Sequence, residues 1–154
     1  DTDISVGAYH VLELDTDGTE QAEHFINAVG EDLSGRLIPA VEVRLRGLYR
    51  LLPPDYYEAA DNLADFCDRI EKQYGVRPVI YCTERTYKNI VASDSRFNKD
   101  KIWYESLFSK PDEDMDWTFW TYTNRVKFSF YESSEYLHMT VFNGSEDDFK
   151  KLIK

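Results

Sequence analysis

Glu42 and Arg44 stand out because they place two charges on one face of an otherwise apolar stretch, residues 37–44. This stretch predicts a short buried strand. Side chains alternate along a strand, so Glu42 and Arg44 share one face and Val41 and Val43 the other. Charged side chains are seldom buried without a partner. Two interpretations follow: a structural ion pair, which is the simpler one, or a functional site at the carboxyl end of the strand.

The composition limits the classes of partner. The chain has 154 residues, of which 42% are hydrophobic and 15% aromatic, so it is long and apolar enough to fold around a core. Its net charge of -11 argues against nucleic acid and against anionic membrane surfaces. No apolar run is long enough to span a bilayer. No signal peptide is visible and the chain begins at Asp1, so we expect it to have been trimmed or processed.

The two cysteines, Cys67 and Cys82, lie in a predicted helix and a predicted strand. They lack the CxxC spacing and the neighbouring histidines of a metal site, so we expect no metal and no cofactor. Two buried free thiols are the favoured interpretation, with a single disulfide as the alternative.

Hydrophobic periodicity and turn residues predict strands alternating with helices, followed by strands alone. This order is typical of an α/β barrel whose last part is mostly strand, in a single domain over residues 1–154. The predicted strands lie near residues 4–12, 37–43, 77–83, 101–107, 117–123 and 136–142, and the predicted helices near 19–29, 54–74, 84–92 and 145–153.

Several stretches together resemble glycoside hydrolase family 25, the muramidases that cleave peptidoglycan. They are GAYH at 7–10, EQAEHF at 20–25, PAVEV at 39–43, YGVRPVIY at 74–81, WTFWTY at 117–122 and VFNG at 141–144. The resemblance covers nearly the whole chain and implies a TIM-barrel-like (β/α)5(β)3 glycosidase fold. The family's barrel begins with two further strands, the first carrying an Asp, so the barrel is expected to be truncated at its N-terminus.

The residues at the family's catalytic positions differ. The family has Asp-x-Glu where this chain has Glu42, Val43 and Arg44, and the Glu is the family's proposed general acid. The last strand of the family carries an Asp and an Asn where this chain has His138 and Thr140. Glycoside hydrolysis usually needs a carboxylic acid to protonate the leaving oxygen, which an arginine cannot do. A histidine can donate a proton near neutral pH, although a hydrogen-bonded, non-catalytic role is the simpler interpretation of His138.

The resemblance therefore implies a catalytically degenerate relative of the muramidases, with peptidoglycan or a related glycan as partner, outside the cell or in its envelope. The alternative is an active hydrolase in which Glu42 works with another acid, such as Glu105 or Glu13. Missing strands would leave open sheet edges, through which the chain could form a homo-oligomer. Four aromatic residues match family positions in or under the cleft, with core packing as the alternative for each: Tyr9, Tyr81, Trp120 and Tyr122. Trp103 is a further candidate for substrate binding.

Overall fold

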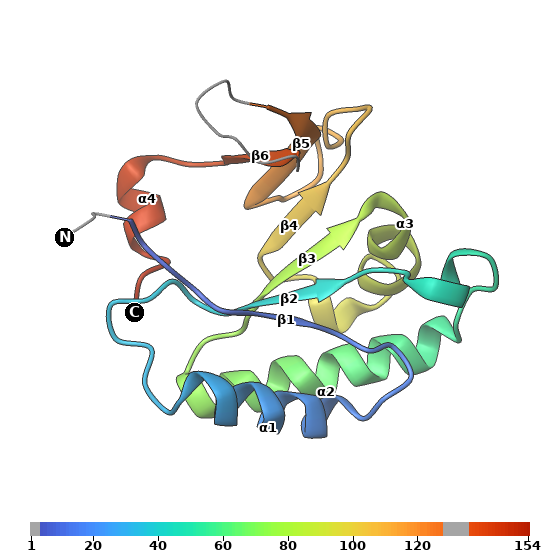
Figure 1. Ribbon diagram of the computed structural model, residues 1–154, viewed down its shortest axis with the longest axis horizontal. Coiled ribbons are helices and arrows are strands. Elements are labelled where there is room, and N and C mark those ends of the chain that lie inside the picture. The colour runs from blue at the N-terminus through green and yellow to red at the C-terminus, as the bar shows by residue number, and fades with distance from the viewer. Residues whose placement is uncertain (1–3, 128–135) are drawn as a thin grey trace.

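The fold is built on one six-stranded sheet, seen in a computed structural model that describes residues 4–127 and 136–154 (Figure 1). The strands follow one another across the sheet in chain order. Each of the first four strands pairs parallel with the next, and the fifth and sixth pair antiparallel. The strands are β1 (Tyr9–Val11), β2 (Ala40–Val43), β3 (Val79–Thr83), β4 (Ile102–Glu105), β5 (Phe119–Val126) and β6 (Leu137–Phe142).

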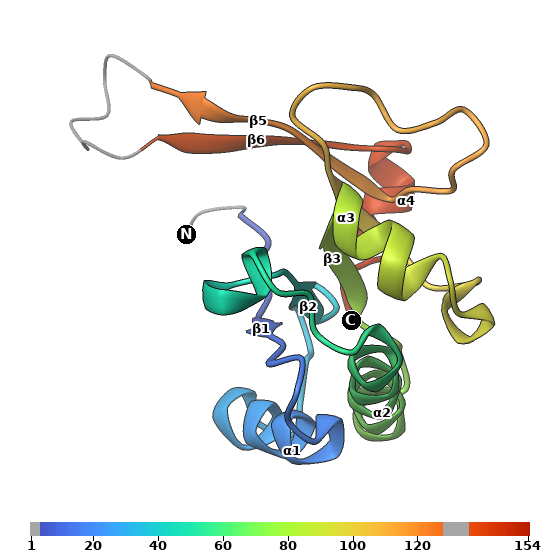
Figure 2. The ribbon, with the colours of Figure 1, turned by 90° about the vertical axis from the view of Figure 1, so that its right-hand side faces the viewer.

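Two long helices cover one face of the sheet at its β1–β3 end, where they lie side by side (Figure 2). Helix α1 (Gly18–Val29) begins at Asp17, whose side chain accepts a hydrogen bond from the Glu20 amide. Helix α2 (Tyr56–Tyr74) begins at Asp55 in the same way and ends at Gly75, which has the left-handed conformation that favours glycine. Both helices therefore begin and end at signals in the sequence.

The remaining helical segments are short. They are η1 (Gly47–Arg50), α3 (Glu84–Thr86), the π-helical turn η2 (Tyr87–Val91), η3 (Ser95–Phe97) and α4 (Glu146–Lys150). None of the helices in the described part of the chain is long and apolar enough to cross a membrane.

The core lies between the sheet and the two long helices. Val41 and Val43 of β2 are fully buried and pack in one cluster with Ile80 of β3 and with Leu63 and Phe66 of α2. Because these strand residues point towards the helices, the alternate residues Glu42, Tyr81 and Trp103 point to the other, concave face. The same alternation that points the apolar side chains into the core therefore points Glu42, Tyr81 and Trp103 to the concave face.

The predicted order of strands and helices is confirmed, with differences at the ends. Strand β1 is shorter than expected, β5 continues to Val126, and the helix expected near 84–92 is an α-helical turn followed by a π-helical turn. Cys67 and Cys82 are buried free thiols, as favoured. The sheet is open: within the described residues no strand joins β6 to β1. The fold is thus a truncated α/β barrel that is not closed.

Candidate functional site

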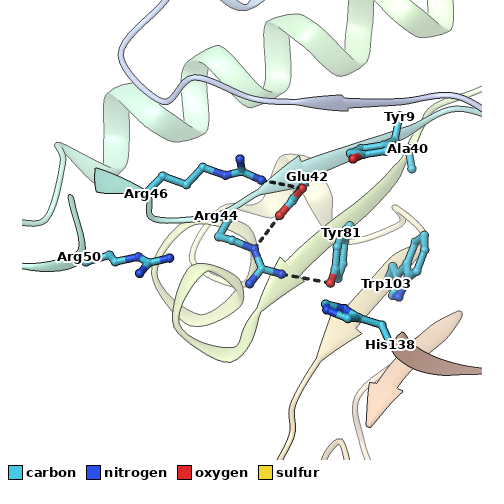
Figure 3. Close-up of a pocket in the computed structure, with 9 residues that line it drawn as sticks. All are labelled: Tyr9, Ala40, Glu42, Arg44, Arg46, Arg50, Tyr81, Trp103 and His138. Atoms are coloured by element: carbon cyan, nitrogen blue, oxygen red, sulfur yellow. Dashed lines mark hydrogen bonds and ion pairs between the residues drawn. The ribbon is translucent and has the colours of Figure 1, made fainter. Parts of the chain in front are cut away.

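A cavity of about 570 Å³ opens on the concave face, near the carboxyl ends of the parallel strands (Figure 3). Ligands of open α/β sheets bind outside these strand ends, and the volume is in the range of small-molecule sites. Nine residues line it: Tyr9, Ala40, Glu42, Arg44, Arg46, Arg50, Tyr81, Trp103 and His138.

Arg44 is the centre of the polar network in this cavity. Its Nε donates to Glu42 Oε1 at 2.6 Å, and its two terminal nitrogens bind both carboxylate oxygens of Glu105, at 3.1 and 2.6 Å. Arg44 also donates to the hydroxyl of Tyr81 at 3.1 Å, and that hydroxyl donates to Glu105. The predicted Glu42–Arg44 ion pair is confirmed, and Glu105 of β4 joins it from the other side.

The strands bring this network together through their register. Glu42 of β2 pairs with Tyr81 of β3, which pairs with Trp103 of β4. Paired residues point to the same face, so these three side chains form one layer of the cavity. Glu105 lies two residues after Trp103 on that face, close to where Arg44 continues beyond β2.

The pairing fixes the charges of the network. Burial of Glu105 acts to raise the pKa of its carboxyl, but the hydrogen bonds from Arg44 and Tyr81 outweigh burial and hold that pKa below its usual value. Burial likewise opposes the charge on Arg44, yet the contacts with Glu105 raise the pKa of the guanidinium above its usual value. The pKa of the Tyr81 phenol is also raised, by burial and then by its hydrogen bond to Glu105. At neutral pH Glu105 is therefore ionised and Tyr81 keeps its proton.

Two further arginines follow Arg44 in the chain. The Nη2 atom of Arg46 donates to Glu42 Oε2 at 3.0 Å, so both oxygens of Glu42 are bound by guanidinium groups. Arg50, in η1, points into the cavity from the same side (Figure 3). The prediction from sequence missed Arg46 and Arg50, because the segment after residue 44 has no periodicity. The spacing of three arginines at 44, 46 and 50 was the available signal.

The opposite side of the cavity is aromatic. The rings of Tyr81 and Trp103 stack with centroids 4.7 Å apart, and the Trp103 indole donates to Thr121 at 2.8 Å. Tyr9 is 65% exposed at the rim, and His138 reaches the cavity from β6. Flat, partly exposed rings of this kind offer apolar faces with polar edges, which suits stacking against a sugar.

Two predicted binding residues lie elsewhere. Trp120 and Tyr122 alternate with Phe119 and Thr121 along β5, so they occupy the face turned away from the cavity. Trp120 packs against the core and its indole donates to the Ser106 carbonyl, while Tyr122 tilts against Trp120. Neither residue lines this cavity, and Trp120 has the core-packing role that was the alternative interpretation. Strand alternation assigned the residues of β5 to two faces, but it did not predict which face lines the cavity.

Metal ligation finds no support in the described residues. Across 4–127 and 136–154, no three His, Cys, Asp or Glu side chains group as a metal site. Glu13, one of the acids considered for the alternative function, is exposed and lines a neighbouring depression that shares Arg44 and Arg46 with the cavity. Glu42 and Glu105 are thus the carboxylates that meet in the network around Arg44.

Comparison with known proteins identifies the family. The family model of glycosyl hydrolases family 25 matches residues 1–129. A family 25 glycosyl hydrolase from Bacillus anthracis is 31% identical, with a TM-score of 0.86 over 99% of this chain and 70% of that chain. A bacterial lysozyme from Streptomyces coelicolor is 22% identical (TM-score 0.76; 96% of this chain, 71% of that chain).

A family GH25 lysozyme from Aspergillus fumigatus shares the fold at 18% identity, with a TM-score of 0.73 over 96% of this chain and 72% of that chain. No curated protein sequence matches significantly. The family model covers most of this chain. The Bacillus anthracis structure matches almost the full length of this chain at 31% identity. The chain belongs to glycosyl hydrolase family 25.

Proposed function

We propose that this chain is a catalytically degenerate member of family 25 that binds peptidoglycan or a related glycan without cleaving it. The observation that carries the proposal is the position of Arg44, clamped between Glu42 and Glu105 inside the cavity. The family model supports the proposal that the chain acts outside the cell or in its envelope.

Hydrolysis requires a group that is protonated before reaction and can give its proton to the leaving oxygen. By the sequence resemblance, Arg44 stands where the family has its proposed acid, and an arginine stays charged at any working pH. Glu105 is held ionised by Arg44 and Tyr81. Glu42 has a guanidinium on each oxygen. The geometry therefore supports two ionised carboxylates whose charges are compensated by arginines, rather than a general acid and a nucleophile.

Binding of a glycan requires complementary surfaces but no proton donor. The Tyr81–Trp103 stack and the exposed ring of Tyr9 offer flat surfaces beside polar donors, in a cavity with room for a sugar ring. The rigid network around Arg44 holds Tyr81 in place without a ligand, which lowers the entropy lost on binding. The aromatic wall therefore supports the proposal that the site retains a glycan without cleaving it.

Two measurements on the same protein test the proposal: co-sedimentation with insoluble peptidoglycan, and release of reducing ends from it. We expect binding without release. Tyr9→Ala should weaken binding about five- to tenfold, or about 1–1.4 kcal/mol. Tyr57→Ala is the matched control, because Tyr57 is 87% exposed on α2 and lies outside the cavity. Release of reducing ends that is lost in Glu42→Gln would establish the active hydrolase instead.

Restoring a carboxylate at position 44 should not create activity. We expect Arg44→Glu to release no reducing ends, because His138 and Thr140 still stand where the family has Asp and Asn. The substitution also places a third carboxylate between Glu42 and Glu105, so it should lower the melting temperature markedly. A cell-wall clearing assay and a thermal melt on both proteins measure the two effects. Clearing by Arg44→Glu would show that one residue separates this chain from an enzyme.

A further inference from the structure

We propose that Arg46 and Arg50 form an anion-binding subsite, so that the cavity selects glycans carrying a charged oxyanion substituent, carboxylate or phosphate, over neutral ones. This inference rests on the proposed glycan-binding function and names its ligand class. The juxtaposition that carries it is a pair of arginines facing an aromatic wall across one cavity.

The charges in the cavity do not balance. Three guanidinium groups line the cavity, and two of them, those of Arg44 and Arg46, pair with the carboxylates of Glu42 and Glu105. Arg44 uses its donors on both carboxylates, and Arg46 uses Nη2 on Glu42. Among the described residues Arg50 makes no ion pair. The cavity therefore holds one uncompensated positive charge together with unused guanidinium donors.

This local charge has the opposite sign to the chain as a whole. The net charge of -11 repels long polyanions at a distance. At physiological salt, charges more than about 8 Å away are largely screened, so contact with the arginines decides binding once a ligand has entered. The combination favours a short glycan with an isolated charge over a nucleic acid or another dense polyanion.

The placement of the arginines gives the ligand its expected orientation. Figure 3 shows Arg46 and Arg50 on one side of the cavity and Tyr81 and Trp103 on the other. A sugar ring stacked on the aromatic side would direct a substituent at its edge towards the arginines. The planar fork of a guanidinium matches the paired oxygens of a carboxylate or phosphate. The arginines of the subsite thus bind the charged substituent, while the aromatic wall binds the sugar ring.

Matched ligand pairs test the selection by calorimetry. One arm compares a tetrasaccharide bearing a single glucuronic acid with its methyl ester, which keeps the rings and removes the charge. The other compares a mannose tetrasaccharide bearing a 6-phosphate with the dephosphorylated sugar. We expect at least one charged form to bind about tenfold more tightly than its neutral partner, or about 1.4 kcal/mol. The advantage should disappear between about 0.01 M and about 1 M salt, as the screening length falls from about 30 Å to about 3 Å.

The variants are Arg50→Gln and, as the matched control, Arg125→Gln, which removes the same charge from an exposed site outside the cavity. Arg50→Gln should abolish the preference for the charged ligand and leave binding of the neutral one unchanged. Equal affinity for charged and neutral partners in both arms, absence of binding in both, or equal losses in the two variants would overturn the subsite. Retention on insoluble peptidoglycan is measured separately, so the proposed function is judged independently of this result.

Discussion

At the scale of single residues, the site is governed by one arginine shared between two acids. Removing one partner of a paired, largely buried charge leaves the other uncompensated, which costs about 3–5 kcal/mol. The Glu105 side chain is only 8% exposed and takes two hydrogen bonds from Arg44 and one from Tyr81. The network therefore ties β2 to β4 across β3 and stabilises the concave face.

Glu105→Gln tests this contribution through its pH dependence. The pKa of Glu105 is lowered in the folded chain, so its stabilisation is present above the unfolded value of about 4.3 and is lost as the pH falls through the folded value. We expect the variant to be about 3 kcal/mol less stable than the parent at pH 7. The difference should shrink steadily as the pH falls below about 4. Urea unfolding of both proteins over a pH series measures it.

The control for this prediction is Glu31→Gln, since Glu31 is exposed and makes no ion pair within residues 4–127 and 136–154. It should leave stability within about 0.5 kcal/mol of the parent at every pH. A destabilisation of Glu105→Gln that stayed the same at all pH values would mean that packing, and not charge, holds Glu105 in place.

The sequence predicted part of this network. Glu42 and Arg44 are two residues apart, so strand alternation alone placed them on one face. Glu105 lies 61 residues from Arg44, and only the register of β2, β3 and β4 brings the two together. Register depends on how whole strands pack, which single residues do not reveal. Arg50 was missed for a related reason, because irregular backbone gives no period from which a direction can be predicted.

At the scale of elements, the strands and helices were predictable because their signals are local. Asp17, Asp55 and Gly75 mark helix ends, and the apolar stripe of α2 faces the sheet. The position of Trp120 and Tyr122 depends on a higher level of structure: each face of β5 carries both aromatic and polar side chains, so tertiary packing decides which face lines the cavity.

The contact between α1 and α2 depends on a glycine. A Cβ atom added at Gly18 would lie 1.8 Å from the backbone oxygen of Asn62, and 2.9 Å from the Phe66 amide nitrogen. Backbone atoms inside α2 cannot move aside as a side chain can. We expect Gly18→Ala to destabilise the chain by about 3 kcal/mol, at the upper end for overpacking. Asn27→Ala, on the exposed face of α1, should change stability by less than about 0.5 kcal/mol. Similar urea midpoints for the two variants would show that α1 and α2 separate freely.

At the scale of the whole molecule, the open sheet leaves β1 with a single strand neighbour among the described residues. Ala8 and Leu12 use their backbone groups to bind the β2 side, at Ala40 and Glu42. By alternation, the amides of Tyr9 and Val11 point to the open edge. A row of unpaired amides next to exposed apolar side chains is a template for pairing with another chain. The side chains of Ile4 and Val6 are 72% and 60% exposed beside this edge.

We therefore predict that two copies associate through β1. Val11→Pro should prevent this, because proline removes only the outward amide and an edge strand tolerates it. Val11→Ala loses a similar side chain but keeps the amide, so it should still associate. Sedimentation velocity over a concentration series compares the parent with both variants, and thermal melts check that each is folded. In the parent, amide exchange at Tyr9 and Val11 should slow as the concentration rises. A parent that stays monomeric while both amides exchange rapidly would show that this edge is simply left open to water.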